Sequence, residues 1–496
     1  MRQKVVIIGS GLGGLSAGAI LARAGYDVTV IERHSVAGGC LQCFSRNGTR
    51  FETGMHFVGA VEPGQILHRI LTLCGVADDV KFSRLNPDGY NVISLAGRRF
   101  RYAAGREAFI DTLAADIGGH QKEIAAAFDL MRSCARSSSL YTSRSETDAA
   151  FLASEYHLTS IGDVFRSLGV NGLLRDVMGG DLSLYAGNID TTPFSAMAFL
   201  KEFYSDGGYR FVGGSSTLAD ALVKVIRQCG GEVYTRREAI RIECGAARAD
   251  AVVTNTGERF EADYILSDIH PSALMPLLDT PLLRPAYRQR MLSLENVISA
   301  FTVYLTFHEG ALRYMDSNLF GYTHPTPWGC EDFTGTRWPG GYLYMHHADT
   351  DENGYARCGQ IISYMRFAEV EKWAHTRLGN RPEEYHLFKK ERAERLIDAV
   401  EKDVPGLRKA IKAINVSTPL TYRDYTGTPQ GSMYGVSKNL LLGTSNRVSY
   451  KTRIPNLFLI GQNINSHGML GVLVGTLVSC AELPGLNDIF KRLYHE

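Results

Sequence analysis

Two cysteines separated by two residues, Cys40 and Cys43, are the first side chains that suggest chemistry. They lie in the stretch GGCLQCF, and a Cys-x-x-Cys spacing serves redox dithiols and half of many zinc sites. A zinc site needs a second pair of ligands, and the sequence holds no other close Cys/His pair of suitable spacing. We therefore expect these cysteines to be small packing side chains, with a redox or metal role as the alternative.

A glycine-rich loop upstream indicates a different kind of chemistry. The stretch GSGLGG places Gly9, Gly11 and Gly14 at G-x-G-x-x-G spacing, between the apolar run KVVII and the helical pattern LSAGAILARAGY. The next apolar run, DVTVIE, ends on Glu32, 18 residues after Gly14. Strand, glycine loop, helix, strand and acid in this order predict a dinucleotide-binding unit. The glycines would allow the tight turn, the approach of a diphosphate and close helix packing, while Glu32 would bind a ribose.

The composition excludes several classes of protein. Lys plus Arg number 53 and Asp plus Glu 52, so the protein has no large net positive charge that would attract nucleic acid. Nine cysteines in no repeating framework predict free thiols in a reducing compartment. The N-terminal residues run directly into a strand, so we expect no signal peptide. The longest apolar run, Gly468–Cys480, is shorter than the roughly 18 residues of a membrane span. A cytoplasmic protein of two or three structural units is expected.

Further motifs carry a resemblance to a known family. A second glycine pair, Gly38 and Gly39, is followed by FETGMHFVG, and later by TPQGSMYGV and IPNLFLIGQNI. Together with the first glycine loop, these motifs resemble the FAD-dependent amine oxidase and phytoene desaturase superfamily. The variants GGC, TGMH and GQN are most similar to the retinol saturase branch, whose relatives are carotenoid isomerase and phytoene desaturase. Many members carry Arg after the doublet, where this chain has Cys40, so one expected phosphate contact is missing.

The resemblance implies an α/β fold. A Rossmann-like FAD-binding domain of the glutathione reductase type would be interleaved with an α+β substrate domain. The FAD-binding domain is expected over residues 1–76, 205–274 and 445–496. The substrate domain is expected over residues 77–204 and 275–444, with a hairpin at YNVISLAGRRFRY, strands at AFTVYLTF and QIISYMRF, and a charged helix near EEYHLFKKERAERLIDAVEKDV.

The resemblance also implies which residues contact FAD, in separate stretches of the chain. The first stretch supplies Gly9, Ser10, Gly11, Leu12, Gly13, Gly14, Glu32, Arg33, Gly38, Gly39, Cys40, Thr53, Gly54, Met55 and His56. The later stretches supply Ile240, Gly461, Gln462, Asn463, Gly468, Met469, Leu470 and Gly471. The helix that begins near Gly468 would direct its first amides at the flavin.

The function implied by the resemblance is reduction of a C=C bond in a long apolar isoprenoid or polyene. Hydride from reduced flavin N5 would add to one carbon of a conjugated bond and a proton to its partner. His56, His467 and Tyr434 are the candidate catalytic side chains for that proton. The alternative for His56 is packing or orienting the flavin, and for Tyr434 an apolar wall.

Three questions stay open in the sequence. An isomerase or a desaturase would share the fold, and Rab GDP-dissociation inhibitors share it as prenyl-binding scaffolds without flavin. No second strand–glycine loop–helix unit is present, so the electron donor is open, with NAD(P)H as a candidate. A lipid-soluble substrate suggests peripheral membrane contact, for which the cluster RRFRY, Arg98–Tyr102, is the only basic–aromatic stretch singled out. We expect neither a metal nor a nucleic acid partner.

Overall fold

A parallel sheet of five strands forms one end of the molecule. The computed structural model describes residues 2–138, 140 and 155–494, and this sheet has the order β19-β13-β1-β2-β9. Its strands are β1 (Lys4–Ile8), β2 (Asp27–Ile31), β9 (Glu232–Tyr234), β13 (Tyr264–Ser267) and β19 (Leu457–Leu459). The strands expected at KVVII and DVTVIE are confirmed, and their near-continuous apolar runs fit a sheet covered on both faces.

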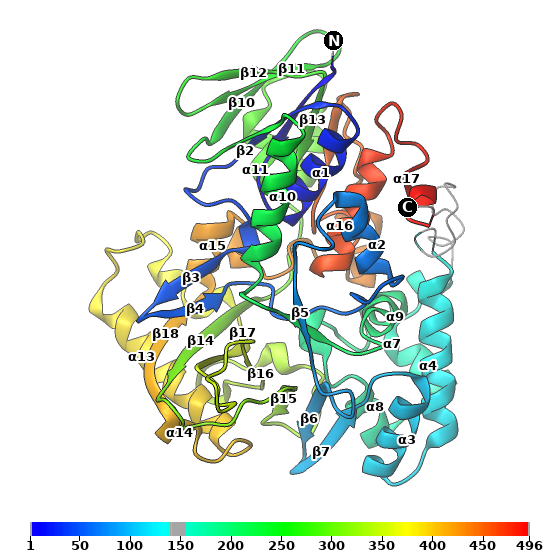
Figure 1. Cartoon of the computed structure of the whole chain (residues 1–496), viewed down its shortest axis with the longest axis vertical. Coiled ribbons are helices and arrows are strands. Elements are labelled where there is room, and N and C mark those ends of the chain that lie inside the picture. Colours follow the sequence, from blue (N-terminus) through cyan, green and yellow to red (C-terminus); the bar gives the residue numbers. More distant parts are fainter. Residues whose placement is uncertain (1, 139, 141–154, 495–496) are drawn as a thin grey trace.

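Three helices pack together at this sheet: α1 (Leu12–Arg23), α10 (Ser216–Gln228) and α16 (Gly468–Cys480). α1 lies against both α10 and α16, in the upper half of Figure 1. α10 begins after Ser215, as the serine-rich start of its sequence predicts. A smaller antiparallel sheet lies beside the parallel one and contains β10 (Ala239–Cys244), β11 (Ala249–Thr254) and β12 (Arg259–Glu261).

A second, larger sheet occupies the lower half of Figure 1. It has seven strands in the order β18-β14-β17-β16-β15-β6-β7, and only the β15–β6 pair is parallel. The strands are β6 (Asn91–Leu95), β7 (Arg98–Tyr102), β14 (Ser299–Phe307), β15 (Asn318–Tyr322), β16 (Gly341–His346), β17 (Cys358–Met365) and β18 (Ile411–Ser417). The expected β6–β7 hairpin and the strands at AFTVYLTF and QIISYMRF are confirmed.

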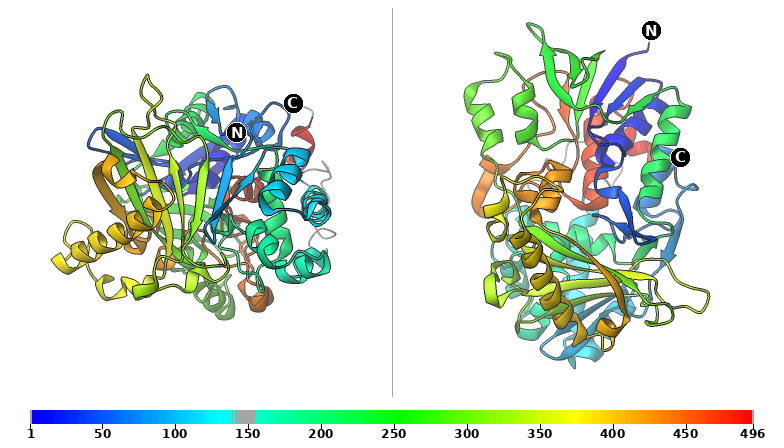
Figure 2. Two further views of the ribbon diagram at one scale, coloured as in Figure 1. Left: turned by 90° about the horizontal axis from the view of Figure 1, so that it is seen from below. Right: turned by 90° about the vertical axis from the view of Figure 1, so that its left-hand side faces the viewer.

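Helices cover the seven-stranded sheet and continue beyond its edge. Figure 2 shows α13 (Glu383–Glu401) along one side of the sheet, with α3 (Arg106–Ile117) and α4 (Gln121–Arg136) on the opposite side. Leu396 of α13 shares a buried cluster with Val303 of β14. The charged helix expected near EEYHLFKKERAERLIDAVEKDV is therefore confirmed as α13.

The remaining helices and strands lie outside these sheets. The helices are α2 (Ile66–Cys74), α7 (Ile161–Ser167), α8 (Gly172–Met178), α9 (Phe194–Phe203), α11 (Pro271–Leu274), α12 (Pro285–Leu292), α14 (Leu407–Ala410), α15 (Pro419–Thr426) and α17 (Ile489–Arg492). The strands are β3 (Cys43–Arg46) paired with β4 (Thr49–Glu52), and β5 (Phe82–Arg84) paired with β8 (Tyr209–Phe211).

The two large sheets follow the interleaving of the sequence. Every strand of the parallel sheet lies within residues 1–76, 205–274 or 445–496, and every strand of the seven-stranded sheet lies within 77–204 or 275–444. The hairpin β3–β4 reaches from the first set to the second, because Phe51 of β4 packs with Tyr304 of β14 and Cys358 of β17. The domain boundaries themselves stay a prediction.

Candidate active site

One large cavity lies between the two sheets. Its volume is about 2170 Å³, and its lining includes Gly9 and Glu32 from the parallel sheet and Leu343 and Ile362 from the seven-stranded sheet. A typical small-molecule pocket has roughly 300–1,000 Å³. This cavity therefore has room for a dinucleotide and a second long ligand.

The first glycine loop forms one end of the cavity. Gly9 has φ +96°, a conformation that favours glycine, and a Cβ added at Gly14 would lie 2.0 Å from the carbonyl oxygen of Gly9. The turn and the close packing predicted for these two glycines are thus present. Gly39 approaches the same loop, because a Cβ there would lie 2.9 Å from Cα of Gly11.

Glu32 follows β2 and is fixed beside this loop. The amide of Ser10 donates to Glu32 Oε2 at 3.0 Å, and the amide of His34 donates to Oε1 at 2.8 Å. The side chain is buried but lines the cavity. It therefore lies where a ribose acceptor of the dinucleotide-binding pattern is expected.

A second acid at this loop, Asp268, was missed by the sequence analysis. The amide of Gly14 donates to Asp268 Oδ2 at 3.0 Å, and Cβ atoms added at Gly11 and Gly13 would each lie 2.4 Å from one of its carboxyl oxygens. Burial raises the pKa of Asp268 to about 7, and the negative charge of Glu32 adds to the shift. Asp268 follows β13, which pairs in parallel with β1, and the residues after neighbouring parallel strands meet at one edge; this order of the sheet is not contained in the spacing of the motifs.

The C-terminal motif closes the cavity from another side. Asn463 Oδ1 accepts a hydrogen bond from the amide of Val436 at 3.1 Å. Lys438, which the sequence analysis did not single out, donates to the carbonyls of Asn463 at 2.9 Å and Ile464 at 2.8 Å. Burial lowers the pKa of Lys438 to about 8. The lysine thus fixes the loop that leads to α16.

α16 begins at Gly468, as expected, and the residue before it makes no side-chain hydrogen bond to the first amides. Gly468, Met469, Leu470 and Gly471 line the cavity, so these amides remain available to an acceptor on a ligand. The glycine cradle, Glu32 and the uncapped start of α16 together fit the donor and acceptor pattern of FAD.

Most of the residues expected to contact FAD line this cavity; Gly14, Gly38, Gly461 and Ile240 do not. The first three lie directly behind the lining: the amide of Gly38, for example, donates to the carbonyl of Ser10 at 2.9 Å. Ile240 is different, because its side chain is 51% exposed and turned away from the cavity. A β-bulge between Ala239 and Arg241 leaves Ile240 out of the strand register, and its neighbours Arg237, Glu238 and Ala239 line the cavity instead. The contact expected at Ile240 is one between its backbone and the adenine of FAD, and that contact stays a prediction.

Tyr434 and His467 lie together in the cavity wall. Their rings stack with centroids 4.1 Å apart, and the hydroxyl of Tyr434 donates to the carbonyl of Ser183 at 2.9 Å. His467 Nε2 donates to the carbonyl of Leu184 at 3.2 Å, and burial lowers the pKa of this histidine to about 4. Burial also raises the pKa of Tyr434. Both side chains thus direct their protons at backbone carbonyls.

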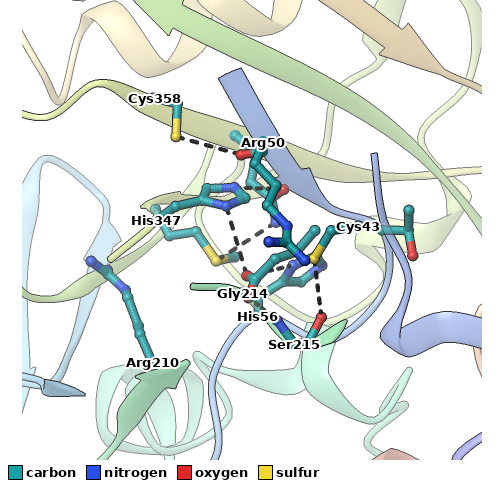
Figure 3. Close-up of polar contacts among 12 residues, drawn as sticks. Cys43, Arg50, His56, Arg210, Gly214, Ser215, His347 and Cys358 are labelled. Carbon is teal, nitrogen blue, oxygen red and sulfur yellow. Dashed lines mark hydrogen bonds and ion pairs between the residues drawn. The ribbon is translucent and has the colours of Figure 1, made fainter. Parts of the chain in front are cut away.

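His56, the third candidate, lies beside a buried carboxyl group. Its Nδ1 is 3.7 Å from Glu52 Oε2, at the end of β4, and the ring lines the cavity. Burial lowers the pKa of His56 to about 3. A second histidine, His347, approaches the same oxygen at 3.8 Å (Figure 3). Neither Glu52 nor His347 was identified from the sequence.

The cysteine pair lies at the cavity but contacts neither a metal cluster nor a partner thiol. Cys43 Sγ is 3.9 Å from Ser215 Oγ, and all nine cysteines are free. Desolvation by the surrounding protein, together with the negative charge of Asp268, raises the pKa of the Cys40 thiol to about 11. Within residues 2–138, 140 and 155–494, no group of three or more His, Cys, Asp or Glu side chains could hold a metal ion. The absence of redox chemistry at this pair stays a prediction.

The basic–aromatic stretch Arg98–Tyr102 is a strand of the large sheet. Phe100 and Tyr102 are fully buried, and Arg101 pairs with Asp116 at 2.7 Å. The stretch therefore exposes no aromatic surface, and none of its residues lines the cavity. The suggestion that this cluster forms a membrane-contacting rim of the cavity is therefore wrong. In the part of the chain that the structure describes, no helix is long and apolar enough to cross a membrane.

Comparison with known proteins identifies one matching family and relatives that are oxidoreductases of retinoids and carotenoids. The model of the flavin-containing amine oxidoreductase family matches residues 12–352. The chain is 26% identical to all-trans-retinol 13,14-reductase of Homo sapiens, over 96% of this chain and 85% of that protein. It is 25% identical to 4,4'-diapolycopene oxygenase of Methylomonas sp, over 94% of this chain and 95% of that protein.

Among solved structures, an oxidoreductase from Methanosarcina mazei superposes with a TM-score of 0.64 at 17% identity, covering 96% of this chain and 99% of that one. The fold is therefore that of the FAD-dependent oxidoreductases, as the sequence motifs predicted. The family match, the fold and the glycine cradle agree, and the chain belongs to the flavin-containing amine oxidoreductase family as an FAD-dependent oxidoreductase.

Proposed function

We propose that this enzyme is a saturase that reduces a C=C bond of a long conjugated isoprenoid, such as a retinoid or carotenoid. The observation that carries the proposal is its similarity to all-trans-retinol 13,14-reductase across nearly the whole chain. FAD, when bound and reduced, supplies the hydride for such a reaction.

The apolar wall of the cavity supports a substrate of this kind. It is formed by side chains of α9 and of the seven-stranded sheet, among them Phe199, Leu200, Phe203, Leu343 and Ile362. These side chains would hold an extended hydrocarbon chain and keep water away from its conjugated bonds. Polar groups that reach the cavity, such as His56, would deliver the proton.

A proton donor must hold a transferable proton that faces the substrate. Tyr434 and His467 each donate to a backbone carbonyl, which supports a role for this pair as a wall. His56 has no hydrogen-bond partner at Nδ1 among the described residues and lies next to a buried acid. We therefore place the proton delivery at His56.

A carotenoid desaturase or isomerase is the second candidate function. The similarity to 4,4'-diapolycopene oxygenase, over nearly the full length of both chains, favours a carotenoid as the substrate. Anaerobic incubation with all-trans-retinol and with a linear carotenoid, followed by mass spectrometry, separates the reactions. A gain of two hydrogens from reduced enzyme supports the saturase. An unchanged mass with a new retention time indicates an isomerase, and loss of two hydrogens with oxidised enzyme a desaturase.

NAD(P)H is the electron donor that we propose, bound without a domain of its own. Rapid mixing of the anaerobic enzyme with NADH or NADPH tests this, because reduction bleaches the flavin absorbance. If neither nucleotide bleaches it, another reductant serves the enzyme.

We also propose that the mouth of the cavity contacts a membrane surface, from which an apolar substrate would enter. Leu158 and Leu378 both line the cavity and are 65% and 58% exposed. Exposed apolar side chains at an opening are suited to shallow contact with lipid. Flotation with liposomes tests the contact, and replacing both leucines by Ser should abolish it while FAD stays bound.

A further inference from the structure

We propose that Glu52 stores the transferred proton as a neutral carboxylic acid and passes it to the substrate through the His56 ring. This assignment rests on the proposed function, because it names the source of the proton for that reaction. Glu52 acts through His56 and does not itself touch the substrate.

The backbone around Glu52 fixes the roles of its two oxygens. Glu52 ends β4 and is 5% exposed. The amide of Ser215, just before α10, donates to Glu52 Oε1 at 3.0 Å. Oε1 therefore acts as an acceptor, as the carbonyl oxygen of a carboxylic acid does, and Oε2 is the oxygen that can carry the proton.

Two histidines lie near Oε2, and a hydrogen bond fixes the tautomer of one of them. His347 Nε2 lies 3.2 Å from Gln360 Oε1, an oxygen that only accepts, so Nε2 carries the hydrogen and Nδ1 the lone pair. That Nδ1 is 3.8 Å from Glu52 Oε2, and Nδ1 of His56 is 3.7 Å from the same atom (Figure 3). An ionised Oε2 would face the lone pair of His347 without a hydrogen between them. A proton on Oε2 removes this repulsion and can be directed at either of the two nitrogens, one at a time.

The surrounding charges agree with a neutral Glu52. Burial raises its pKa to about 7, although His347, Arg210 and Arg50 all act to lower it. Arg210 in β8 is itself occupied, since its guanidinium donates to the carbonyls of Met315 at 2.8 Å and Ser317 at 2.8 Å. Burial lowers the pKa of His347 to about 4 and of His56 to about 3. At pH 6 to 7 the one titratable proton in this group therefore resides on Glu52.

The remaining titratable neighbour is a thiol. Cys358 of β17 lies across β4, and its Sγ is 3.9 Å from the carbonyl of Arg50. Burial raises the pKa of this thiol, so it stays protonated and uncharged beside Glu52. It neither takes nor gives a proton in the proposed step.

The proposed proton transfer converts one neutral tautomer of His56 into the other. The Oε2–H bond of Glu52 breaks as Nδ1 of His56 gains that proton, and the Nε2–H bond of His56 breaks as the substrate carbon gains its hydrogen. Nδ1 is the buried nitrogen of the ring, so Nε2 is the one on the cavity side. With the hydride, the substrate gains two electrons and two hydrogens, which the reduced flavin and Glu52 lose. Nδ1 then returns its proton to Glu52 as Nε2 takes up one proton from bulk solvent, which restores the starting tautomer and makes that solvent proton the one consumed in each cycle.

Glu52→Gln tests the assignment, because Gln keeps the shape and the Ser215 contact but has no acidic proton. Glu261→Gln, the same change at an exposed side chain of β12, is the control. Infrared spectra of the apoprotein between pH 5 and 9 should show carboxylic acid C=O absorption that titrates near pH 7 in wild type and control. Glu52→Gln should lose the Glu52 share of this absorption and keep the share of Asp268, which Asp268→Asn removes. Identical spectra of wild type and Glu52→Gln would overturn the assignment.

Turnover gives the second readout. In wild type, kcat should fall above pH about 7 as Glu52 loses its proton, while Glu52→Gln should be lower by about 10²–10³-fold and lack this limb, with KM and FAD content unchanged. Glu52→Gln within twofold of wild type at pH 6 would overturn the relay. If wild type reduces no polyene, the proposed function fails, and the infrared band decides the protonation of Glu52 by itself.

Discussion

The carboxyl group of Asp268 accepts a hydrogen bond from the amide of Gly14 at 3.0 Å and thereby lies at the N-terminus of α1. This is the end of the helix at which dinucleotide-binding folds hold a diphosphate. Two anions at one helix end repel each other, and burial already raises the pKa of Asp268 to about 7. Binding of FAD therefore favours the protonated form of this acid.

FAD affinity should consequently depend on pH. Because the negative diphosphate raises the pKa of Asp268 further, binding takes up a proton, and the affinity is full below pH about 6. Above pH 7 the dissociation constant should rise by up to about tenfold per pH unit. Asp268→Asn keeps the shape without the charge and should flatten this dependence. Quenching of FAD fluorescence by the apoprotein measures both.

Glu261→Gln serves here too as the control, since its exposed carboxylate lies on β12 in the small antiparallel sheet. It should keep the wild-type slope. A wild-type dissociation constant that does not change between pH 6 and 9 would show that Asp268 carries no proton into the complex.

Gly11→Ala should weaken FAD binding by at least about tenfold. A Cβ at Gly11 would lie 2.4 Å from Asp268 Oδ2 and on the side where the diphosphate must approach the backbone. Gly89→Ala is the matched control, because its Cβ would meet the Arg101 side chain at 3.4–3.5 Å, which is ordinary van der Waals contact. Titration with FAD measures the change, and circular dichroism checks that both variants fold. Equal affinities of the two variants would contradict the assigned loop.

The local parts of this site could be predicted from the sequence, because their signals lie within a few dozen residues. Gly9, Gly14 and Glu32 form one strand–loop–helix–strand unit whose spacing has few structural solutions. The same holds for the start of α16 at Gly468. The contacts made by these segments with one another depend on how the sheet is ordered, which the spacing does not contain.

Long-range contacts account for what was missed. His347 reaches Glu52 only because the hairpin β3–β4 packs across the seven-stranded sheet, and no local pattern links the two residues. Ile240 lies in the predicted strand, but a register shift there leaves its side chain exposed, which the strand pattern does not predict. A strand pattern fixes alternation only while the register is regular.

The double variant Cys40→Ala/Cys43→Ala should retain its flavin and most of its turnover. Both thiols are free, and the raised pKa of Cys40 disfavours the thiolate that redox chemistry requires. Flavin absorbance and product formation are measured at pH 7. A loss of activity by orders of magnitude at full FAD content would place the thiols in the reaction.

Tyr434→Phe should leave kcat within about fivefold of wild type. Its hydroxyl donates to the carbonyl of Ser183, so its loss removes one buried hydrogen bond and about 0.5–1.5 kcal/mol of stability. Chemical denaturation measures the stability and product analysis the rate. A 100-fold fall in kcat with FAD retained would instead make Tyr434 the proton donor.

The central claim is that this enzyme adds two hydrogens to a polyene. The most direct measurement is an anaerobic single turnover in which photoreduced enzyme is mixed with all-trans-retinol or a linear carotenoid, and flavin reoxidation and product mass are followed together. The account predicts one dihydro product for each flavin reoxidised, whichever polyene is accepted. Flavin that stays reduced while the polyene keeps its mass would contradict it.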